Sequence, residues 1–518
     1  MEPLPQKPNW PLSTLLTIAD VSNPSGFGDP LIGGVTADSR AVRAGNLFVA
    51  VRGAKADGLS FAAQAIAAGA VAILAQDFAD LDPALQGKIP CIPHPWPTQA
   101  LARLAAFFQP GQPSFMAAVT GTNGKTSTVE FARQLWQLQG LPAASLGTLG
   151  VLSPVDVPPA PSLTTADPVS LHSILAALAQ QGVQHAVMEA ASHGLVQHRL
   201  DGVALNAAVF TNLTQDHLDY HGTMAAYFAA KARLFAVLLP RGAGAIINID
   251  TPYGQDLARL CQTRGHRLIT FGQAPAADLR FDQWQATTLG QSARLHHGGQ
   301  SYPITLPLIG QFQLYNLLGA IGLVLSSGVG LDAILPHLDQ LAGIAGRAEL
   351  VGHHPNGAGV VVDYAHTPDG LENILSSVRQ HTAGAGSRLH VVFGCGGNRD
   401  STKRPMMGAI AQRLADVVYV TDDNPRFEDP TLIRSAILSA CPNAHEIGDR
   451  AQAIAQAIGQ LNPGDNLVIA GKGHEQGQLV AGVTKPFDDK QVAQQVLATL
   501  GGMATPHSHA NASLGQCA

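Results

Sequence analysis

Short runs of apolar residues, many of them rich in Val and Ile, recur along the chain. They are Ala70–Ala75, Phe115–Thr120, Ala186–Ala190, Ala207–Asn212, Ala245–Ile249, Val360–Tyr364, Leu389–Gly394, Val417–Thr421 and Leu467–Gly471. Stretches rich in Ala and Leu with helical spacing separate them. Strands that are apolar on both faces and alternate with helices are typical of parallel sheets covered on each side. The pattern predicts an α/β protein with doubly wound sheets, in which ligands bind beyond the carboxyl ends of the strands.

Clusters of residues that break helices and strands divide this pattern. The clearest is Gln109-Pro-Gly-Gln-Pro113, which stands just before the run at 115–120. A weaker one lies at Gly343–Gly346, after the helical pattern Leu331–Leu341. Beyond Leu500 the residues are small or polar and show no periodicity, so we expect disorder there. We predict domains at residues 1–113, 114–343 and 344–500, followed by a disordered tail at 501–518.

Composition narrows the class of protein. A chain of 518 residues is too long for one core. The net charge is −6 and no basic run is present, so we expect neither a nucleic-acid partner nor binding to an acidic membrane surface. The five cysteines form no C-x-x-C pair, which fits reduced thiols in a cytosol. The apolar runs are too short to span a bilayer, so we predict a cytoplasmic protein without membrane insertion. We also expect a monomer.

A candidate phosphate-binding loop, Gly121-Thr-Asn-Gly-Lys-Thr-Ser127, follows the run at 115–120 and precedes the helical pattern Val129–Leu138. A Gly-rich turn between strand and helix presents backbone N–H groups and a lysine to phosphates, and a hydroxyl to Mg²⁺. The usual pattern has Gly where Val119 stands, so an ordinary glycine turn with a solvated Lys125 is the alternative. The candidate ATP-binding residues are Gly121, Thr122, Asn123, Gly124, Lys125, Thr126 and Ser127.

Two candidate metal ligands follow the next predicted strands. Glu189 ends one strand, and His217 follows the other within the segment Thr211-Asn-Leu-Thr-Gln-Asp-His217. Parallel strands bring both to the sheet edge that carries the phosphate loop, where oxygen and imidazole ligands could hold divalent ions. Taken singly, each side chain is more often structural. Their convergence on one loop favours metal binding.

The C-terminal third repeats this arrangement without a phosphate loop. Its strands end in Asp363-Tyr-Ala-His-Thr-Pro-Asp369, Gly394-Cys-Gly-Gly-Asn-Arg-Asp400, Asp422-Asp-Asn-Pro-Arg426 and Gly471-Lys-Gly-His-Glu475. Such strand ends form a pocket with charges of both signs, which suits a zwitterion because Arg binds a carboxylate and an acidic residue binds an ammonium. Each motif alone could be a capped turn.

The motifs GTNGKTS, MEAASHGLVQHR, TNLTQDHLDYHG, DYAHTPD, GCGGNRD, DNPR and GKGHE, in this order, resemble those of the Mur ligase family. The resemblance extends from about Thr36 to Leu500. It implies three domains: an N-terminal one for the UDP end of a substrate, a central P-loop domain for ATP, and a C-terminal Rossmann-like domain for an incoming amino acid.

The resemblance also implies roles for particular residues. Lys125, Lys231, Glu189 and His217 would be catalytic. Mg²⁺ ions would bind Thr126, Glu189, His217 and a carbamylated Lys231, although spacing alone predicts that Lys231 is a solvated helix lysine. The UDP-substrate residues would be Ser39, Thr164, Thr165, Ser192, Gln197 and Arg199. The diaminopimelate residues would be Arg399, Asp423, Asn424, Pro425, Arg426, Gly471 and Glu475.

The chain departs from the family pattern at three places. Ala54-Lys-Ala56 stands where relatives often have His-Gln-Ala, so uridine contacts at Ala54 and Lys55 are in doubt. Ala191 replaces the first of two paired serines, which removes a hydroxyl contact. Leu163 precedes the threonine pair where some relatives have Asn.

The activity implied by the resemblance is ATP- and Mg²⁺-dependent ligation in cytoplasmic peptidoglycan precursor synthesis. Meso-2,6-diaminopimelate would be added, through an acyl phosphate, to the D-glutamyl side-chain carboxylate of UDP-N-acetylmuramoyl-L-alanyl-D-glutamate. An L-lysine-adding relative is the close alternative, and lacks Arg at the position of Arg426. A ligase like folylpolyglutamate synthase and a P-loop regulatory switch are more distant alternatives. The first lacks a comparable domain ahead of the loop and does not carry DNPR.

Overall fold

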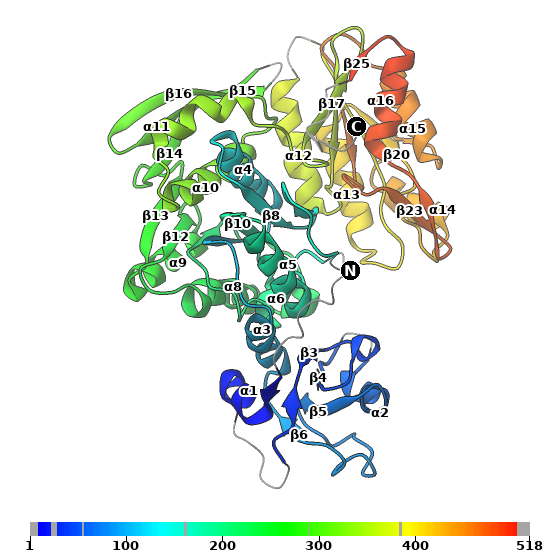
Figure 1. Cartoon of the computed structure of the whole chain (residues 1–518). Coiled ribbons are helices and arrows are strands. Elements are labelled where there is room, and N and C mark those ends of the chain that lie inside the picture. Colours follow the sequence, from blue (N-terminus) through cyan, green and yellow to red (C-terminus); the bar gives the residue numbers. More distant parts are fainter. Residues whose placement is uncertain are drawn as a thin grey trace, which may run out of the picture. The chain divides into compact units, whose positions relative to one another are not determined.

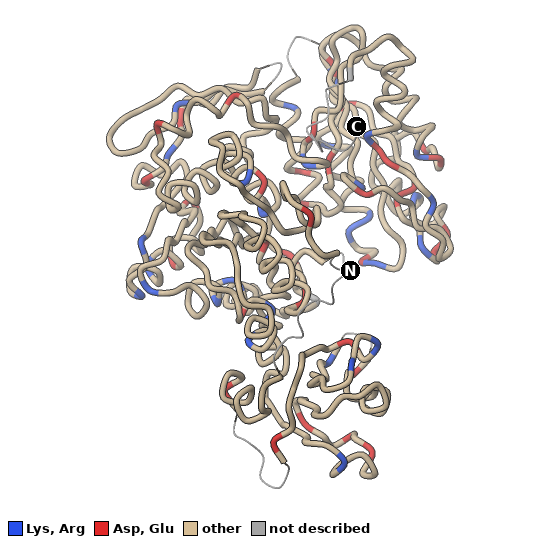
Figure 2. The backbone as a smooth tube through the Cα atoms, in the orientation of Figure 1, with Lys and Arg blue, Asp and Glu red and all other residues tan. Residues whose placement is uncertain are grey.

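The computed structural model describes residues 9–21, 28–53, 56–159, 163–287, 290–382 and 386–504 (Figure 1). Contacts divide the chain into two compact units. The first holds Met1–Ala277 and Gly319–Gly330, and the second holds Asp278–Leu318 and Leu331–Ala518. Ala54, Lys55 and most of the predicted tail lie outside the described residues. Basic and acidic residues are interspersed along the described backbone (Figure 2).

The first unit begins with a small parallel sheet. Its strands run in the order β3 (Gly34–Thr36), β4 (Asn46–Val49), β5 (Ala70–Ala75) and β6 (Cys91–Pro93). Alternate residues of β4 enter different cores, since Leu47 packs with α1 (Leu12–Ala19) and α3 (Pro97–Phe108), whereas Phe48 packs with α2 (Ala62–Ala67). Helices therefore cover both faces. A two-stranded sheet of β1 (Trp10–Pro11) and β2 (Leu31–Ile32) precedes it.

A larger sheet in the first unit carries the phosphate loop. Its strand order is β13-β12-β11-β7-β10-β8-β9, and all neighbours are parallel except β8 and β9. The strands are β7 (Phe115–Thr120), β8 (Ala143–Gly147), β9 (Gly150–Leu152), β10 (His185–Glu189), β11 (Ala207–Phe210), β12 (Gly244–Asn248) and β13 (Arg267–Gly272). Strand β7 lies between β10 and β11, so the candidate residues that follow these three strands meet at one edge.

Helices connect the strands of this sheet. They are α4 (Lys125–Leu138), α5 (Pro168–Gln180), α6 (Ser192–Val196), α7 (Leu218–His221), α8 (Met224–Arg233) and α9 (Pro252–Arg264). Three of the four longer ones begin with a side-chain cap on the first free N–H groups: Asp167 caps α5, Thr223 caps α8 and Thr251 caps α9. Gly124 precedes α4 without such a cap. Among these four longer helices, α4 is therefore the one whose first turn has no side-chain cap.

The second unit contains a doubly wound sheet with strand order β21-β20-β19-β22-β18-β17-β25. These strands are β17 (Glu349–His353), β18 (Gly359–Asp363), β19 (Leu389–Phe393), β20 (Val417–Val420), β21 (His445–Glu446), β22 (Asn466–Ala470) and β25 (Met503–Ala504). The strands from β18 to β21 are parallel, and β17 and β25 are antiparallel additions. Two residues of the predicted tail, Met503 and Ala504, therefore belong to the sheet.

Both faces of this sheet are covered. Val391 and Phe393 of β19 pack with α12 (Pro368–His381), α13 (Lys403–Leu414) and α14 (Pro430–Leu438). Val392, which points to the opposite face, packs with α15 (Arg450–Gly459) and α16 (Asp489–Thr499). Burial on both faces explains why the sequence of β19 is apolar throughout, and the prediction of doubly wound parallel sheets is confirmed.

The apolar runs do not reveal the antiparallel strands of the second unit. These are β14 (Leu279–Thr287), β15 (Gly290–His297), β16 (Gln300–Leu306) and the hairpin β23 (Gly477–Val480) with β24 (Val483–Pro486). In β14 buried residues such as Phe281 alternate with more exposed ones such as Asp282, because only one face is covered. Continuous apolar runs occur only where both faces are buried.

Two further helical features complete the second half of the chain. Helix α10 spans Phe312–Ser326. The predicted helical pattern at Leu331–Leu341 is divided into α11 (Leu331–Ile334) and a 3₁₀ helix at Leu335–Gln340, where Pro336 stands in the first turn and interrupts the α-helical hydrogen bonds. No helix within the described ranges is long and apolar enough to cross a membrane.

Candidate functional site

The phosphate loop wraps around its own lysine. Lys125 is the first residue of α4, and its Nζ donates to the carbonyl oxygens of Gly121 at 3.0 Å and Thr122 at 2.8 Å. Gly124 precedes the helix with φ 84°, a conformation that favours glycine. At Gly121, with φ 154°, an added Cβ would collide with the hydroxyl of Thr211. The open N-terminus of α4 and the lysine together form a site for phosphate oxygens.

Glu189, the last residue of β10, is held beside this loop and is only 1% exposed. Its Oε1 accepts hydrogen bonds from Thr126 Oγ1 at 3.0 Å and from the backbone N–H of Thr148 at 2.8 Å. Its Oε2 is buried and has no hydrogen-bond partner among the described residues. A Cβ on Gly147 would collide with this carboxylate, so glycine leaves the room that it needs. A buried carboxylate oxygen without a protein donor fits a cation ligand.

Lys231 of α8 is buried, being only 1% exposed, which corrects the expectation of a solvated lysine. Its Nζ donates to the carbonyl oxygen of Gly121 at 2.7 Å and lies 4.4 Å from the centre of the Tyr227 ring. Within the described part of the chain it forms no ion pair. Burial, reinforced by the charge of Lys125 and opposed by Asp216, holds the pKa of Lys231 well below its usual value. The lowered pKa favours the neutral form of the amine over the ammonium form.

His217 is the most exposed of the candidate metal ligands, with 47% of its side chain accessible. It precedes α7 in a left-handed conformation, and its Nε2 lies 3.4 Å from Asp216 Oδ2. Its ring centre is 6.3 Å from that of Tyr227, the ring that Lys231 also contacts. Tyr227, whose hydroxyl lies 3.2 Å from Thr122 Oγ1, thus links the loop, Lys231 and His217. No sequence pattern indicates this role of Tyr227, because an aromatic residue on an amphipathic helix usually packs in a core.

Within the described residues, no group of three or more His, Cys, Asp and Glu side chains is placed to hold a metal ion. The ligand set implied by the resemblance is different in kind, because it includes a threonine hydroxyl and a modified lysine. The fit to Mg²⁺ rests instead on Glu189 and its unpartnered oxygen.

The candidate substrate residues of the first unit surround Glu189. Thr165 is buried, and its hydroxyl donates to the carbonyl oxygen of Glu189 at 2.9 Å. Arg199 donates to the carbonyl oxygen of Thr165 at 2.7 Å and to Gln197 Oε1 at 2.6 Å. Burial lowers the pKa of the Arg199 guanidinium from its usual value. These contacts orient a half-buried guanidinium, which suits recognition of an anionic substrate group.

The other candidate substrate residues are placed less tightly. Thr164 Oγ1 lies 3.3 Å from Thr148 Oγ1, and the buried Ser192 hydroxyl lies 3.0 Å from His221 Nε2. Ser39 begins the 3₁₀ helix Ser39–Ala41 after β3, and its hydroxyl donates to Gln64 Oε1 at 3.1 Å.

Sequence reasoning missed a buried network around Asp201. Its carboxylate accepts two hydrogen bonds from Arg233, at 2.9 and 2.6 Å, and one from Gln99 Nε2 at 2.8 Å. Hydrogen bonds from His198, Arg233 and Gln99 outweigh burial and lower the pKa of Asp201 to about 2. The network ties the turn that carries Arg199 to α8, which carries Lys231. These residues are far apart in the sequence, so no local pattern reveals it.

In the second unit Arg426 is fixed by its backbone. It has a left-handed φ of 55°, and its N–H donates to Leu479 O at 2.9 Å while its carbonyl oxygen accepts from Ala481 N at 2.6 Å. Its Nη1 donates to Gly397 O at 2.8 Å. Added Cβ atoms on Gly396 and Gly397 would collide with Arg426 Nη1 and with the carbonyl oxygen of Pro425, respectively. The glycines of the GCGGNRD motif thus make room for the DNPR segment.

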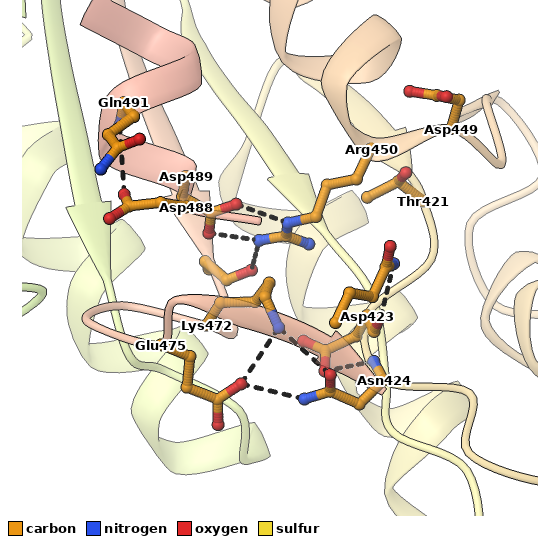
Figure 3. A network of polar contacts seen from close by, with 12 residues as sticks. Thr421, Asp423, Asn424, Asp449, Arg450, Lys472, Glu475, Asp488, Asp489 and Gln491 are labelled. Carbon is orange, nitrogen blue, oxygen red and sulfur yellow. Dashed lines mark hydrogen bonds and ion pairs between the residues drawn. The ribbon is translucent and has the colours of Figure 1, made fainter. Parts of the chain in front are cut away.

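Asp423, Asn424 and Glu475 belong to one network of polar contacts in the same unit (Figure 3). Asp423 is buried and accepts from the backbone N–H of Asn424 at 2.6 Å. Asn424 Nδ2 donates to Glu475 Oε2 at 2.9 Å. The predicted strand ends at 423–426 and 471–475 are therefore brought together, as the parallel topology requires.

Two features support this edge from behind. Arg450 and Asp489 form a fully buried ion pair, with Nε to Oδ1 at 2.7 Å, and Arg450 Nη2 donates to Ala470 O just before Gly471. Burial raises the pKa of the Tyr364 phenol, and the positive charges of Arg347 and Arg399 act against this rise. Arg399 is exposed, and Tyr364 directly follows β18.

Three models of Mur ligase domains match successive parts of the chain. The Mur ligase family, catalytic domain, matches residues 31–109; the Mur ligase middle domain matches residues 119–324; and the Mur ligase, glutamate ligase domain, matches residues 346–473. The three matches follow the order of the N-terminal, phosphate-loop and C-terminal sheets.

Two curated relatives are similar over almost their whole length. The UDP-N-acetylmuramoyl-L-alanyl-D-glutamate--2,6-diaminopimelate ligase of Rhizobium meliloti is 50% identical over 474 residues, covering 91% of this chain and 95% of the relative. The ligase of the same name from Caulobacter vibrioides is 48% identical over 486 residues, covering 93% of this chain and 98% of the relative.

Solved structures agree as well. A structure of a UDP-N-acetylmuramoyl-L-alanyl-D-glutamate--2,6-diaminopimelate ligase superposes with a TM-score of 0.69 and 32% identity, covering 94% of this chain and 99% of the other. Folylpolyglutamate synthase of Mycobacterium tuberculosis, with a TM-score of 0.59 and 19% identity over 77% of this chain and 93% of the other, shares the fold alone. The chain belongs to the Mur ligase family.

Proposed function

We propose that the chain is an ATP-dependent ligase that adds meso-2,6-diaminopimelate to UDP-N-acetylmuramoyl-L-alanyl-D-glutamate. The observation that carries this proposal is the identity of 48–50% with curated diaminopimelate ligases along more than nine tenths of the chain. The amide forms at the D-glutamyl side-chain carboxylate. The reaction takes place in the cytoplasm, during synthesis of the peptidoglycan precursor, and the enzyme acts as a monomer.

The reaction requires activation of the carboxylate, since an amine cannot displace oxide from it. The γ-phosphoryl group of ATP passes to the D-glutamyl oxygen, giving an acyl phosphate and ADP. The amine of diaminopimelate then attacks the acyl carbon, the C–O bond to phosphate breaks, and the nitrogen loses a proton. Lys125 exchanges the carbonyl oxygens of Gly121 and Thr122 for phosphoryl oxygens, where its charge offsets the developing negative charge.

Mg²⁺ fits the residues near the loop. Thr126 and Glu189 would hold one ion, because the hydroxyl is bonded to the carboxylate and Glu189 Oε2 has no partner among the described residues. His217 and a carbamylated Lys231 would hold a second. When bound, such ions neutralise the charge of the phosphate oxygens.

The state of the Lys231 amine supports the proposed carbamylation. Because burial and Lys125 lower its pKa, the neutral amine can attack CO₂, which forms an N–C bond and releases one proton. The product is a carbamate, whose oxygens replace an ammonium that repels cations. The carbonyl oxygen of Gly121 and the face of Tyr227 hold Nζ in place for this step.

The UDP-substrate is held, in this proposal, by Ser39, Thr164, Thr165, Ser192, Gln197 and Arg199. Arg199 carries most of the electrostatic recognition, because its guanidinium is half-buried and oriented by Gln197 and Thr165. The replacements at Ala191 and Leu163 remove two polar groups from this region. Ala54 and Lys55 lie outside the described residues, so the uridine end rests on Ser39 alone here.

Diaminopimelate is held by the second unit, through Arg399, Asp423, Asn424, Pro425, Arg426, Gly471 and Glu475. It differs from L-lysine by one distal carboxylate, so selection requires a group left unpaired when lysine enters. Arg426 supplies that group, because a guanidinium binds a carboxylate through two parallel hydrogen bonds. The glutamate-adding alternative of the folylpolyglutamate synthase type is supported by fold similarity alone.

One experiment tests the proposal. Purified protein with ATP, Mg²⁺ and UDP-N-acetylmuramoyl-L-alanyl-D-glutamate is offered diaminopimelate or L-lysine, and the mass of the nucleotide product is measured. We expect the diaminopimelate adduct to dominate by more than tenfold. Equal amounts of the lysine adduct would overturn the substrate assignment, and no adduct with either amine would overturn the ligase assignment.

A further inference from the structure

Lys472 lies in the turn after β22 and has no accessible side-chain surface. Its Nζ lies 3.0 Å from Glu475 Oε2 and 3.2 Å from Asn424 Oδ1 (Figure 3). Burial of an ammonium is strongly unfavourable unless a charge and hydrogen bonds compensate it. These two partners provide that compensation, and both belong to the candidate diaminopimelate site.

Asn424 completes a closed triangle with Lys472 and Glu475. Its Oδ1 accepts from Lys472 Nζ and from the backbone N–H of Leu479, at 3.2 and 2.9 Å. Its Nδ2 donates to Glu475 Oε2 at 2.9 Å. The side chains of Asn424 and Glu475 are therefore oriented by the same buried cation, although they come from separate segments of the chain.

The triangle leaves Glu475 with two different oxygens. Oε2 receives hydrogen bonds from both Lys472 and Asn424, whereas Oε1 has no hydrogen-bond partner among the described residues. The Glu475 side chain is 35% exposed, and in Figure 3 its second oxygen points away from both donors. One oxygen is thus fixed to the protein and the other is presented to a ligand.

We infer that Lys472 is a positioning residue for the incoming amino acid, and this inference rests on the proposed binding of diaminopimelate by Glu475. Lys472 holds Oε2 so that Oε1 faces the distal ammonium of the amino acid. It also fixes Asn424, which precedes the Pro425-Arg426 segment. Without the ammonium, Glu475 can rotate toward solvent and Asn424 loses one of its two donors. Binding of the amino acid then weakens, while the ATP site in the other unit is unaffected.

A purely structural role gives a different result. Loss of packing or of an ion pair in the second unit would lower thermal stability without changing the Michaelis constant for one substrate alone. Lys490 provides the matched control, because its Nζ forms an ion pair with Glu349 Oε1 at 2.6 Å in the same unit and its side chain is mostly buried. Neither residue of that pair belongs to the proposed binding site.

The test measures kcat and the Michaelis constants for ATP, the UDP-substrate and diaminopimelate in Lys472→Met, Lys472→Arg and Lys490→Met. We expect Lys472→Met to raise the constant for diaminopimelate at least tenfold, with those for ATP and the UDP-substrate within twofold of wild type. Lys472→Arg should restore part of the loss. Lys490→Met should change none of the three constants by more than twofold. A diaminopimelate constant within twofold of wild type in folded Lys472→Met overturns the inference.

Lys472→Gln serves if Lys472→Met does not fold, because it removes the charge and keeps a polar side chain with a hydrogen-bond donor. We expect the same selective increase, of smaller size, and an unchanged constant again overturns the inference. In a Glu475→Gln background, replacing Lys472 should add less than twofold, since the two residues act through one interaction. If wild type itself does not use diaminopimelate, the proposed function fails. If it does and the variants match wild type, only the role of Lys472 fails.

Discussion

Two buried lysines, one in each unit, have opposite surroundings. Lys231 beside the phosphate loop contacts a carbonyl oxygen and an aromatic face, and the nearby charge of Lys125 is of the same sign. Lys472 contacts the carboxylate of Glu475 and the amide oxygen of Asn424. Among the described residues the first amine has no ion-pair partner, and Asp216 only partly offsets the effect of burial, whereas the second ammonium is paired with a carboxylate.

This difference shows that burial of a lysine has no single meaning. At Lys231 the ammonium form is disfavoured, so the site is completed when the amine gains a carboxylate or gives up its proton. At Lys472 the ammonium is matched by an acidic side chain, so it orders its neighbours. We therefore expect the phosphate-loop site to accept added negative charge, and the proposed amino-acid site to hold fixed charges in place.

The largest expected effect on activity comes from replacing Lys231, the lysine that forms no ion pair among the described residues. Lys231→Ala should lower kcat by about a thousandfold or more, because it removes an oxygen ligand close to the transferred phosphoryl group. A short carboxylate such as acetate or formate, added to the assay, should restore part of the activity. Full activity in the folded variant would contradict the role of Lys231.

Lys125 provides a second test of the phosphate-loop site. Lys125→Ala should abolish ligation, with a loss of about a thousandfold or more, because the cation that faces the phosphoryl oxygens is gone. The fold should stay largely intact, which circular dichroism and the melting temperature can verify. Near-normal turnover in that folded variant would remove the basis for placing ATP at this loop.

Replacing Arg426 tests the proposed diaminopimelate site of the second unit. Arg426→Ala should cost roughly 2 to 5 kcal/mol of diaminopimelate binding, which is more than a tenfold rise in its Michaelis constant. The constant for ATP should be almost unchanged. Steady-state kinetics with each substrate varied in turn distinguishes this outcome from a general loss of activity, and an equal change in both constants would speak against the assignment.

Replacing the two lysines is expected to change the stability of the fold in different directions. The pKa of Lys231 is lower in the folded chain than in the unfolded chain, so folding at neutral pH must release a proton or bury a charge, and stability rises as pH rises toward the unfolded value. Lys231→Met should therefore leave the melting temperature unchanged or raise it in CO₂-free buffer. Lys472→Met should lower stability by about 1–3 kcal/mol, because two acceptors lose their donor. A destabilised Lys231→Met with an unaffected Lys472→Met would reverse the comparison.

The strands that the apolar runs predicted lie in parallel sheets and are largely buried, although the buried parallel strand β8 was not expected. Residues 115–120 were expected as a strand and form β7 with the same bounds, since every one of them meets a core. Strands β14 to β16 were not expected, because alternating exposure breaks the apolar run. The helix pattern at Leu331–Leu341 was only partly right, because Pro336 interrupts it.

The two candidate sites differ in how far the sequence reveals them. The phosphate loop is a contiguous motif whose geometry follows from local glycines, so its residues could be named directly. The burial of Lys231 depends on Gly121 and Tyr227 packing against it, and the Lys472 triangle joins residues from positions 424 and 475. Such contacts are set by tertiary packing, which no local pattern contains. The roles of the site residues stay predictions.

The coupling of ATP cleavage to both substrates tests the central claim most directly. Phosphate release is measured with ATP and Mg²⁺ alone, then with the UDP-substrate, with diaminopimelate, and with both. A ligase should release phosphate at a substantial rate only when both are present, in one-to-one proportion with the amide product. Rapid phosphate release with ATP alone, unaffected by either substrate, would instead identify a P-loop switch and contradict the account.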